Sequence, residues 1–113
     1  MTTLDPGQSV AASALTLDHV PVPADQVVSG NPTTGLRVLD ERDGREIGIW
    51  EMTPGTANDT ESDEVFIVLG GRATVRFEDG AQIELGAGSV VRLSAGMRTT
   101  WVVHETLRKV YVA

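Results

Sequence analysis

Residues 64–80, EVFIVLGGRATVRFEDG, decide the fold class of this 113-residue chain. Two short apolar runs, at 64–69 and 72–78, flank the pair Gly70-Gly71, and Asp79-Gly80 follows the second run. Glycine and aspartate at such positions supply the positive φ angles that tight turns require. The stretch therefore predicts two antiparallel β-strands joined by a turn at Gly70-Gly71.

The same pattern of short apolar runs and turn residues continues on both sides of this stretch. The expected strands cover residues 34–41, 45–53, 64–69, 72–78, 81–85, 89–93, 99–105 and 108–112, with a hairpin over 104–109. No stretch keeps a helical period over three turns, and so many strands can close on themselves rather than leave long edges exposed. The sequence predicts an all-β fold, a small antiparallel β-barrel or jelly roll.

The length of the chain suits a single domain. Residues 1–13 are small and polar without a period, so we expect a mobile N-terminal arm followed by one domain over residues 14–113. Residues 13–28, SALTLDHVPVPADQVV, place Pro21 and Pro23 among apolar positions, which permits an edge strand but not a helix interior. Because such a segment would leave an exposed edge, it predicts a homodimer.

The charge of the chain narrows the class of partner. A formal net charge of −7 disfavours nucleic acid and anionic membranes, which both need a positive surface. The absence of cysteine excludes disulfides, thiolate zinc sites and iron–sulfur clusters. The N-terminus lacks the features of a signal peptide, and no apolar run approaches the roughly 20 residues that span a bilayer. We expect a cytoplasmic protein whose partners are small molecules or proteins.

An acidic cluster precedes the strand expected at 64–69. Its members are Asp59, Glu61, Asp63 and Glu64. The glycine and the final glutamate of an EF-hand loop are both missing, so exposed carboxylates on a solvated loop are the simpler interpretation. Glu64 differs because it shares a strand face with Phe66. Its carboxylate lies either at the solvent edge or in an enclosed space, where desolvation would suit it to proton transfer.

Histidine and tryptophan are the other residues that could form a site. The two histidines, His19 and His104, are too few for a metal site with several imidazoles, so we interpret both as structural or exposed. Trp50 and Trp101 each lie in an alternating strand, where core packing is the simpler interpretation. A small barrel can nonetheless enclose one ligand, with a tryptophan as part of the wall.

Four segments, taken in order, resemble a known family. They are GIWEMTPG at 48–55, DEVFIVLGGRATVRFEDG at 63–80, LGAGSVVRLSAGMRTTW at 85–101 and ETLRKVYV at 105–112. Together they resemble the small single-domain cupins of the RmlC-like superfamily, in the branch of ureidoglycine aminohydrolase-type and ethanolamine-utilisation-type proteins. The resemblance covers about residues 25–113. It implies a cupin barrel that pairs through N-terminal strands and outer sheet faces.

The resemblance also bears on metal binding. Cupins hold a metal with three histidines and a glutamate, and Glu64 matches the glutamate. The other positions carry Thr99 at the third histidine and either Ala57 and Asp59 or Asn58 and Thr60 at the first two. This substitution implies a barrel with no transition metal and no other cofactor. An oxygen-only site from Asp59, Asp63 and Glu64, suited to magnesium, calcium or manganese, is an alternative.

The orientation of Trp101 follows from the same comparison. Thr99 stands at an inward position of the cupin pattern, and the period of two then turns Trp101 and Val103 inward as well. Either Val110 or Tyr111 of the last strand is expected to face Trp101. Which of the two does so depends on the length of the preceding turn.

The sequence predicts a metal-free cupin that binds or transforms a small polar metabolite in its barrel. Glu64 is the candidate acid or base, and we expect it to accept hydrogen bonds from neighbours such as Thr99 or Arg98. The expected pocket residues are Thr99, Trp101, Arg98, Phe66 and Trp50. The alternatives are a non-catalytic dimeric binding or structural module and an oxygen-liganded metalloenzyme.

Overall fold

The computed structural model describes residues 4–113 and places nine strands and no helix among them. The strands are β1 (His19–Pro21), β2 (Val27–Ser29), β3 (Thr33–Arg42), β4 (Arg45–Met52), β5 (Gly55–Thr60), β6 (Glu64–Phe77), β7 (Gln82–Leu85), β8 (Val90–Leu93) and β9 (Arg98–Val112). The described chain accordingly has no helix long and apolar enough to cross a membrane.

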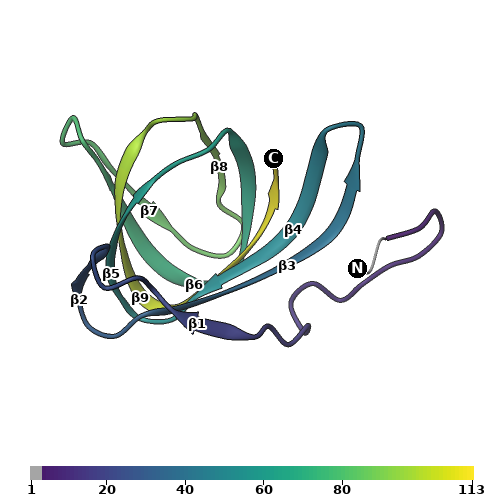
Figure 1. The fold of residues 1–113 in the computed structure, drawn as a ribbon, viewed down its shortest axis with the longest axis horizontal. Helices are drawn as coiled ribbons and strands as arrows, with labels where there is room; N and C mark the ends of the chain where they lie inside the picture. The colour runs from purple at the N-terminus through teal and green to yellow at the C-terminus, as the bar shows by residue number, and fades with distance from the viewer. Residues whose placement is uncertain (1–3) are drawn as a thin grey trace.

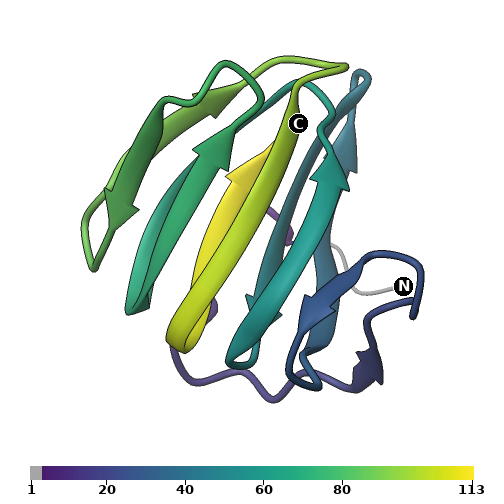
Figure 2. The same ribbon diagram turned by 90° about the vertical axis from the view of Figure 1, so that its left-hand side faces the viewer.

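The strands form one antiparallel sheet in the order β1-β3-β4-β9-β5-β2, with β6 paired to β7, β8 and β9. The sheet curls round on itself (Figure 1), and its strands run side by side in one curved layer (Figure 2). β6 and β9 are the two longest strands, and they pair with each other from Val65↔Val112 to Phe77↔Thr99. They form the centre of the fold. The predicted all-β fold with a curled antiparallel sheet is confirmed.

The turn predicted at Gly70-Gly71 is wrong, as is the hairpin predicted over 104–109. The chain runs through both places as continuous strands, β6 and β9, with register shifts between them near Arg72. Gly71 has a φ of 88°, and a Cβ there would collide with the carbonyl oxygen of Thr106 on β9. The glycine therefore allows a bulge and a close approach of two strands rather than a chain reversal.

Alternation along β4 divides its side chains between two faces of the sheet. Trp50 and Met52 point into the barrel and pack in the main core with Phe66 and Trp101. Ile49 points to the outer face instead, where it packs with Leu17, Leu39, Ala12, Leu15 and Val110. The barrel interior and the outer face thus have separate apolar clusters.

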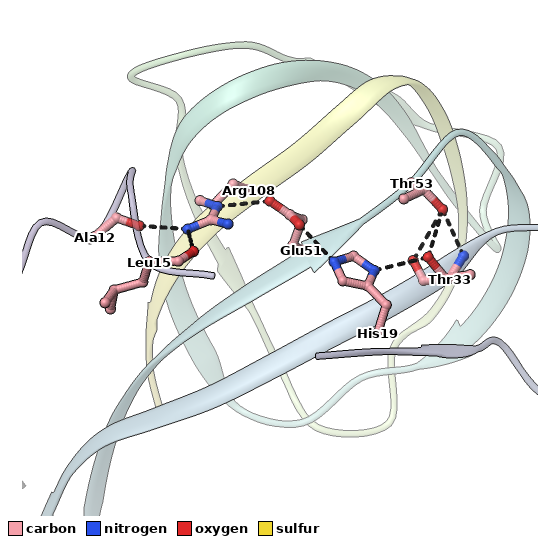
Figure 3. A network of polar contacts seen from close by, with 7 residues as sticks. All are labelled: Ala12, Leu15, His19, Thr33, Glu51, Thr53 and Arg108. Atoms are coloured by element: carbon pink, nitrogen blue, oxygen red, sulfur yellow. Dashed lines mark hydrogen bonds and ion pairs between the residues drawn. The ribbon is translucent and has the colours of Figure 1, made fainter. Parts of the chain in front are cut away.

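The N-terminal segment contacts the outer face of the sheet. The amide of Leu4 donates to the carbonyl of Leu39 at 2.8 Å, and Nη1 of Arg108 donates to the carbonyls of Ala12 at 2.9 Å and Leu15 at 2.6 Å (Figure 3). The mobile arm at residues 1–13 and the domain at residues 14–113 stay predictions, and residues 1–3 lie outside the described part of the chain.

Candidate functional site

Strand β9 provides much of the barrel interior. Thr99, Trp101 and Val103 are buried, and Trp101 is only 3% exposed, which confirms the predicted register. The same alternation continues to the end of the strand, so Tyr111 is buried in the main core while Val110 lies with the outer cluster. Because β9 is one continuous strand along which side chains alternate, Tyr111 lies on the same inward side as Thr99, whereas Val110 does not.

Lys109 is the most unusual of the inward side chains on β9. It is 5% exposed, and its Nζ lies 2.8 Å from Oε2 of Glu64. The ammonium group also lies over the rings of Phe66, Trp50 and Trp101, at 4.2, 4.7 and 5.0 Å from their centroids. Each distance is within the range of a cation–π contact. The barrel thus encloses a cation between one carboxylate and three aromatic rings.

Glu64 points inward from the start of β6, which decides between the two orientations that its sequence position allowed. Its expected hydrogen-bond partners were wrong, because its carboxylate pairs with Lys109, while Thr99 donates to Glu61. Arg98 is exposed at the start of β9, where it lies 3.4 Å from Glu78. The structure therefore brings Glu64, Phe66, Trp50 and Trp101 together around Lys109 and leaves Arg98 at the rim.

Glu61 is buried at 7% exposure, so its predicted place on a solvated loop is wrong. Its Oε2 accepts hydrogen bonds from Oγ1 of Thr99 at 2.5 Å and from Nε1 of Trp101 at 2.9 Å. Backbone hydrogen bonds from Glu61 to Met97 and from Gly96 to Glu61 hold the chain across the barrel end. A signal was present in the sequence, because Glu61 continues the alternation of Ala57 and Asp59.

Strand β5 shows which of the two residue pairs expected at the first histidine positions of the cupin pattern faces inward. Ala57 pairs with Trp101 and Asp59 with Thr99 in the antiparallel register, and directly opposite residues point to the same side. Ala57 and Asp59 are therefore the inward pair. Asn58 faces outward, where its side-chain oxygen accepts from Thr100 at 2.7 Å.

The pKa of Asp59 is raised above its ordinary value. The side chain is open to solvent on one side, but the barrel walls partly desolvate it, and the negative charge of Glu61 adds to the effect. Lys109 acts in the opposite direction by attracting the ionised carboxylate. Asp59 is thus a carboxylate whose charge depends on its neighbours in the barrel.

These residues line a cavity of about 210 Å³. Its walls include Trp50, Trp101, Glu61, Glu64, Lys109 and Tyr111. The hydroxyl of Tyr111 donates to Oε2 of Glu46 at 2.6 Å. Burial, followed by that carboxylate, raises the pKa of Tyr111, so the phenol stays protonated at all physiological pH values. Gly48 on β4 leaves room for this ring, because a Cβ there would overlap it.

The donor set of the barrel does not fit a transition metal. The four positions that match the metal ligands in the resemblance to cupins carry Ala57, Asp59, Glu64 and Thr99, which offer no imidazole. Within residues 4–113, no three side chains of the metal-binding types lie together in a way that could hold an ion. The ammonium of Lys109, bonded to Glu64, would in addition repel a metal cation there.

The two histidines lie outside this interior. Nε2 of His19 lies 2.7 Å from Glu51, and its Nδ1 lies 2.9 Å from Thr33 on the outer face (Figure 3). His104 has its Nε2 3.1 Å from the hydroxyl of Thr74. Both therefore belong to local hydrogen-bond networks of the sheet.

A small antiparallel barrel with its polar residues gathered inside on β5, β6 and β9 defines the protein as a cupin. The family model described as the EutQ-like cupin domain matches residues 39–111. The chain therefore belongs to the EutQ-like cupin family. No match was found among curated proteins.

Several solved structures are similar to this chain. A protein of unknown function of the DUF861 family from Pseudomonas syringae is 22% identical with a TM-score of 0.75, over 88% of this chain and 44% of its own. The EutQ protein of Clostridium difficile is 19% identical with a TM-score of 0.70, over 92% of this chain and 83% of its own. At such identities the likeness shows the fold alone. This chain spans less than half the length of the Pseudomonas protein.

A third similar structure has a higher sequence identity over a shorter length. The DUF861-family protein from Thermotoga maritima is 31% identical with a TM-score of 0.53, over 56% of this chain and 73% of its own. The similar structures thus agree on the fold, and the family model places the chain in the EutQ-like branch.

Proposed function

We propose that this EutQ-like cupin binds a small polar metabolite in its barrel and does so without a metal ion. The observation that carries the proposal is the placement of Glu61, Glu64 and Lys109 around the cavity of about 210 Å³. Burying charged groups costs free energy unless they are paired, and an apolar core would avoid that cost. Their retention at the wall of a cavity supports a binding role.

The size and chemistry of the cavity limit the ligand. Pockets for drug-sized molecules have volumes of about 300–1,000 Å³, so this cavity suits a smaller metabolite. The wall offers the indoles of Trp50 and Trp101 as flat apolar surfaces and several carboxylates as hydrogen-bond acceptors. A compact molecule with O–H or N–H donors fits this wall better than a polyanion does.

Within the proposed site, Glu64 is the candidate acid or base. Its Oε2 bonds to Lys109, and the residue lines the cavity. Thr99 and Trp101 hold Glu61 in place, and Phe66 and Trp50 form the wall around Lys109. Arg98 lines a separate depression that shares Asp59 with this cavity, so it would orient an anionic group of a ligand that reaches past Asp59.

The second candidate function is a non-catalytic module whose outer surface is the active part. The observation that favours it is a set of exposed apolar side chains, Val65, Ile67 and Val90, on the outer face of β6 and β8. Such a patch suits a protein contact. Both candidates are compatible with a cytoplasmic homodimer, which we propose for this chain.

A thermal-shift screen against small metabolites tests the proposed function. A ligand that binds only the folded state raises the apparent stability. We expect pocket ligands to stabilise the wild type and the control Glu105→Gln, whose site lies on the surface beside Arg72, but to stabilise Glu64→Gln less. Equal stabilisation of all three proteins by every ligand found would show that the barrel is not the binding site.

A further inference from the structure

We infer that the ammonium ion of Lys109 is a built-in cation that takes the place of the metal ion in this barrel. The inference does not rest on the proposed function, and its test uses no metabolite. It concerns how the carboxylates at the former metal positions are neutralised.

The position of Lys109 supports this inference. Its side chain enters the barrel from β9, and its Nζ lies 2.8 Å from Oε2 of Glu64, the residue that matches the metal-binding glutamate of cupins. Asp59, the other carboxylate at those positions, is also stabilised in its charged form by Lys109. Asp59, Glu64 and Lys109 all line the same cavity.

The surroundings of Lys109 are built for a cation. Phe66, Trp50 and Trp101 each present a ring to the ammonium group, with the centroids 4.2–5.0 Å away. Ring faces carry partial negative charge, so they replace part of the hydration that the ammonium loses in the barrel. A hydrocarbon side chain of similar length would fill the same space without the desolvation cost, so packing alone does not explain the lysine.

The charges inside the barrel indicate that the ammonium of Lys109 offsets the negative charge of the neighbouring carboxylates. Among the groups that act on Asp59, the carboxylates of Glu61 and Glu64 raise its pKa, and the amide of Thr60 and the ammonium of Lys109 lower it. Without the ammonium, like charges would face one another across the cavity, and a divalent cation would relieve them. With it, a metal ion would meet an existing positive charge as well as too few donors.

The test compares wild-type protein with Lys109→Met, which keeps the length of the side chain and removes its charge. The probe is the side-chain carboxyl carbon of Asp59, followed by NMR from pH 3 to pH 8. We expect the pKa of Asp59 to be higher in the variant, because the ammonium that attracts its ionised carboxylate is lost. The control is Arg72→Met, which removes an exposed cation paired with Glu105. It should leave Asp59 unchanged.

Lys109→Met leaves Glu64 buried without its partner, which can prevent the variant from folding. A second comparison therefore removes the charge of Glu64 as well. Glu64→Gln is compared with Glu64→Gln/Lys109→Met, and the pKa of Asp59 should again be higher in the protein without Lys109. An unchanged pKa in this comparison would overturn the inference.

Metal binding supplies an independent readout. Chelator-treated wild-type protein is titrated with Mn²⁺ and with Zn²⁺ by calorimetry, and with Mn²⁺ by NMR line broadening. We expect neither stoichiometric binding nor selective broadening at Asp59 and Glu64. One equivalent of either metal bound at these two residues with Lys109 in place would overturn the inference.

Discussion

At the scale of single residues, Glu61 shows how one side chain can join the site to the fold. Its Oε2 accepts from both Thr99 and Trp101, so one carboxylate oxygen holds two inward side chains of β9. The sequence placed Glu61 among exposed acids because the loop around it is polar. Only the backbone bonds to Met97 and Gly96 turn it into the barrel.

We predict that Glu61→Gln destabilises the protein by about 1–3 kcal/mol. The amide oxygen can take the place of Oε2 and accept from both the hydroxyl of Thr99 and the indole of Trp101, but the two hydrogen bonds lose the negative charge that strengthens them. Urea unfolding at pH 7 measures the loss. Glu105→Gln, at an exposed carboxylate, should change the stability by less than about 0.5 kcal/mol. Equal effects of the two changes would contradict the structural role of Glu61.

At the scale of the elements, the bulge at Gly71 determines how β6 lies against β9. A register shift occurs on both sides of this residue, and the positive φ of Gly71 lets the two backbones approach at Thr106. The same glycine pair looked like a hairpin turn in the sequence, because both structures use positive φ angles.

We predict that Gly71→Ala is more destabilising than Gly80→Ala. Both glycines have positive φ, 88° and 92°, so both variants bear the strain of about 1–3 kcal/mol expected for a non-glycine residue there. A Cβ at Gly80 has nothing within 4 Å, whereas at Gly71 it would collide with the carbonyl of Thr106. The difference between the unfolding free energies of the two variants measures the cost of that collision. Equal unfolding free energies would show that the collision does not constrain the fold.

The network around Glu51 joins the N-terminal segment to strands β1, β4 and β9. Oε2 of Glu51 accepts from Nε of Arg108 at 2.8 Å, and its Oε1 lies 2.7 Å from His19 (Figure 3). Burial of Glu51 opposes its charged form, but hydrogen bonds from Arg108 and His19 outweigh that effect and lower its pKa.

This lowered pKa predicts how the stability responds to acid. The folded state holds the proton of Glu51 less tightly than the unfolded state, so the charged carboxylate stabilises the fold above its ordinary pKa of 4.5. That contribution is lost as the pH falls below 4.5 through the folded-state pKa. Glu51→Gln should therefore be less stable than wild type at pH 7, with the gap narrowing toward pH 3 in urea unfolding. A gap independent of pH would exclude this role of the charge.

At the scale of the whole molecule, the outer face of β6 and β8 is the part of the fold that a partner copy would cover. Val65, Ile67 and Val90 are 39%, 42% and 67% exposed, and Ile67 pairs directly with Val90. The inward-facing apolar side chains of the same strands pack in the barrel core.

We predict that the protein is a homodimer and that Val90→Lys weakens it, because a charge would be buried in an apolar contact. Light scattering at micromolar concentration measures the mass of both proteins. Leu36→Lys is the control, since Leu36 is 58% exposed but lies at the mouth of the cavity rather than on this outer face. A monomeric wild type would contradict the prediction.

The sequence by itself determined the all-β class, the cupin family and the inward register of Trp101. These depend on local alternation, turn residues and ordered motifs, which are properties of neighbouring residues in the chain. The match of Glu64 to the cupin glutamate came from the resemblance to the family's motif.

Only the tertiary structure decided that β6 and β9 are continuous, that Glu61 is buried and that Lys109 bonds to Glu64 inside a ring of aromatic side chains. Lys109 and Glu64 are 45 residues apart, and Thr99 is 38 residues from Glu61. Such contacts arise from strand pairing between distant segments, and their free energy depends on burial that no local pattern contains. The charge of the barrel interior is therefore a property of the folded sheet.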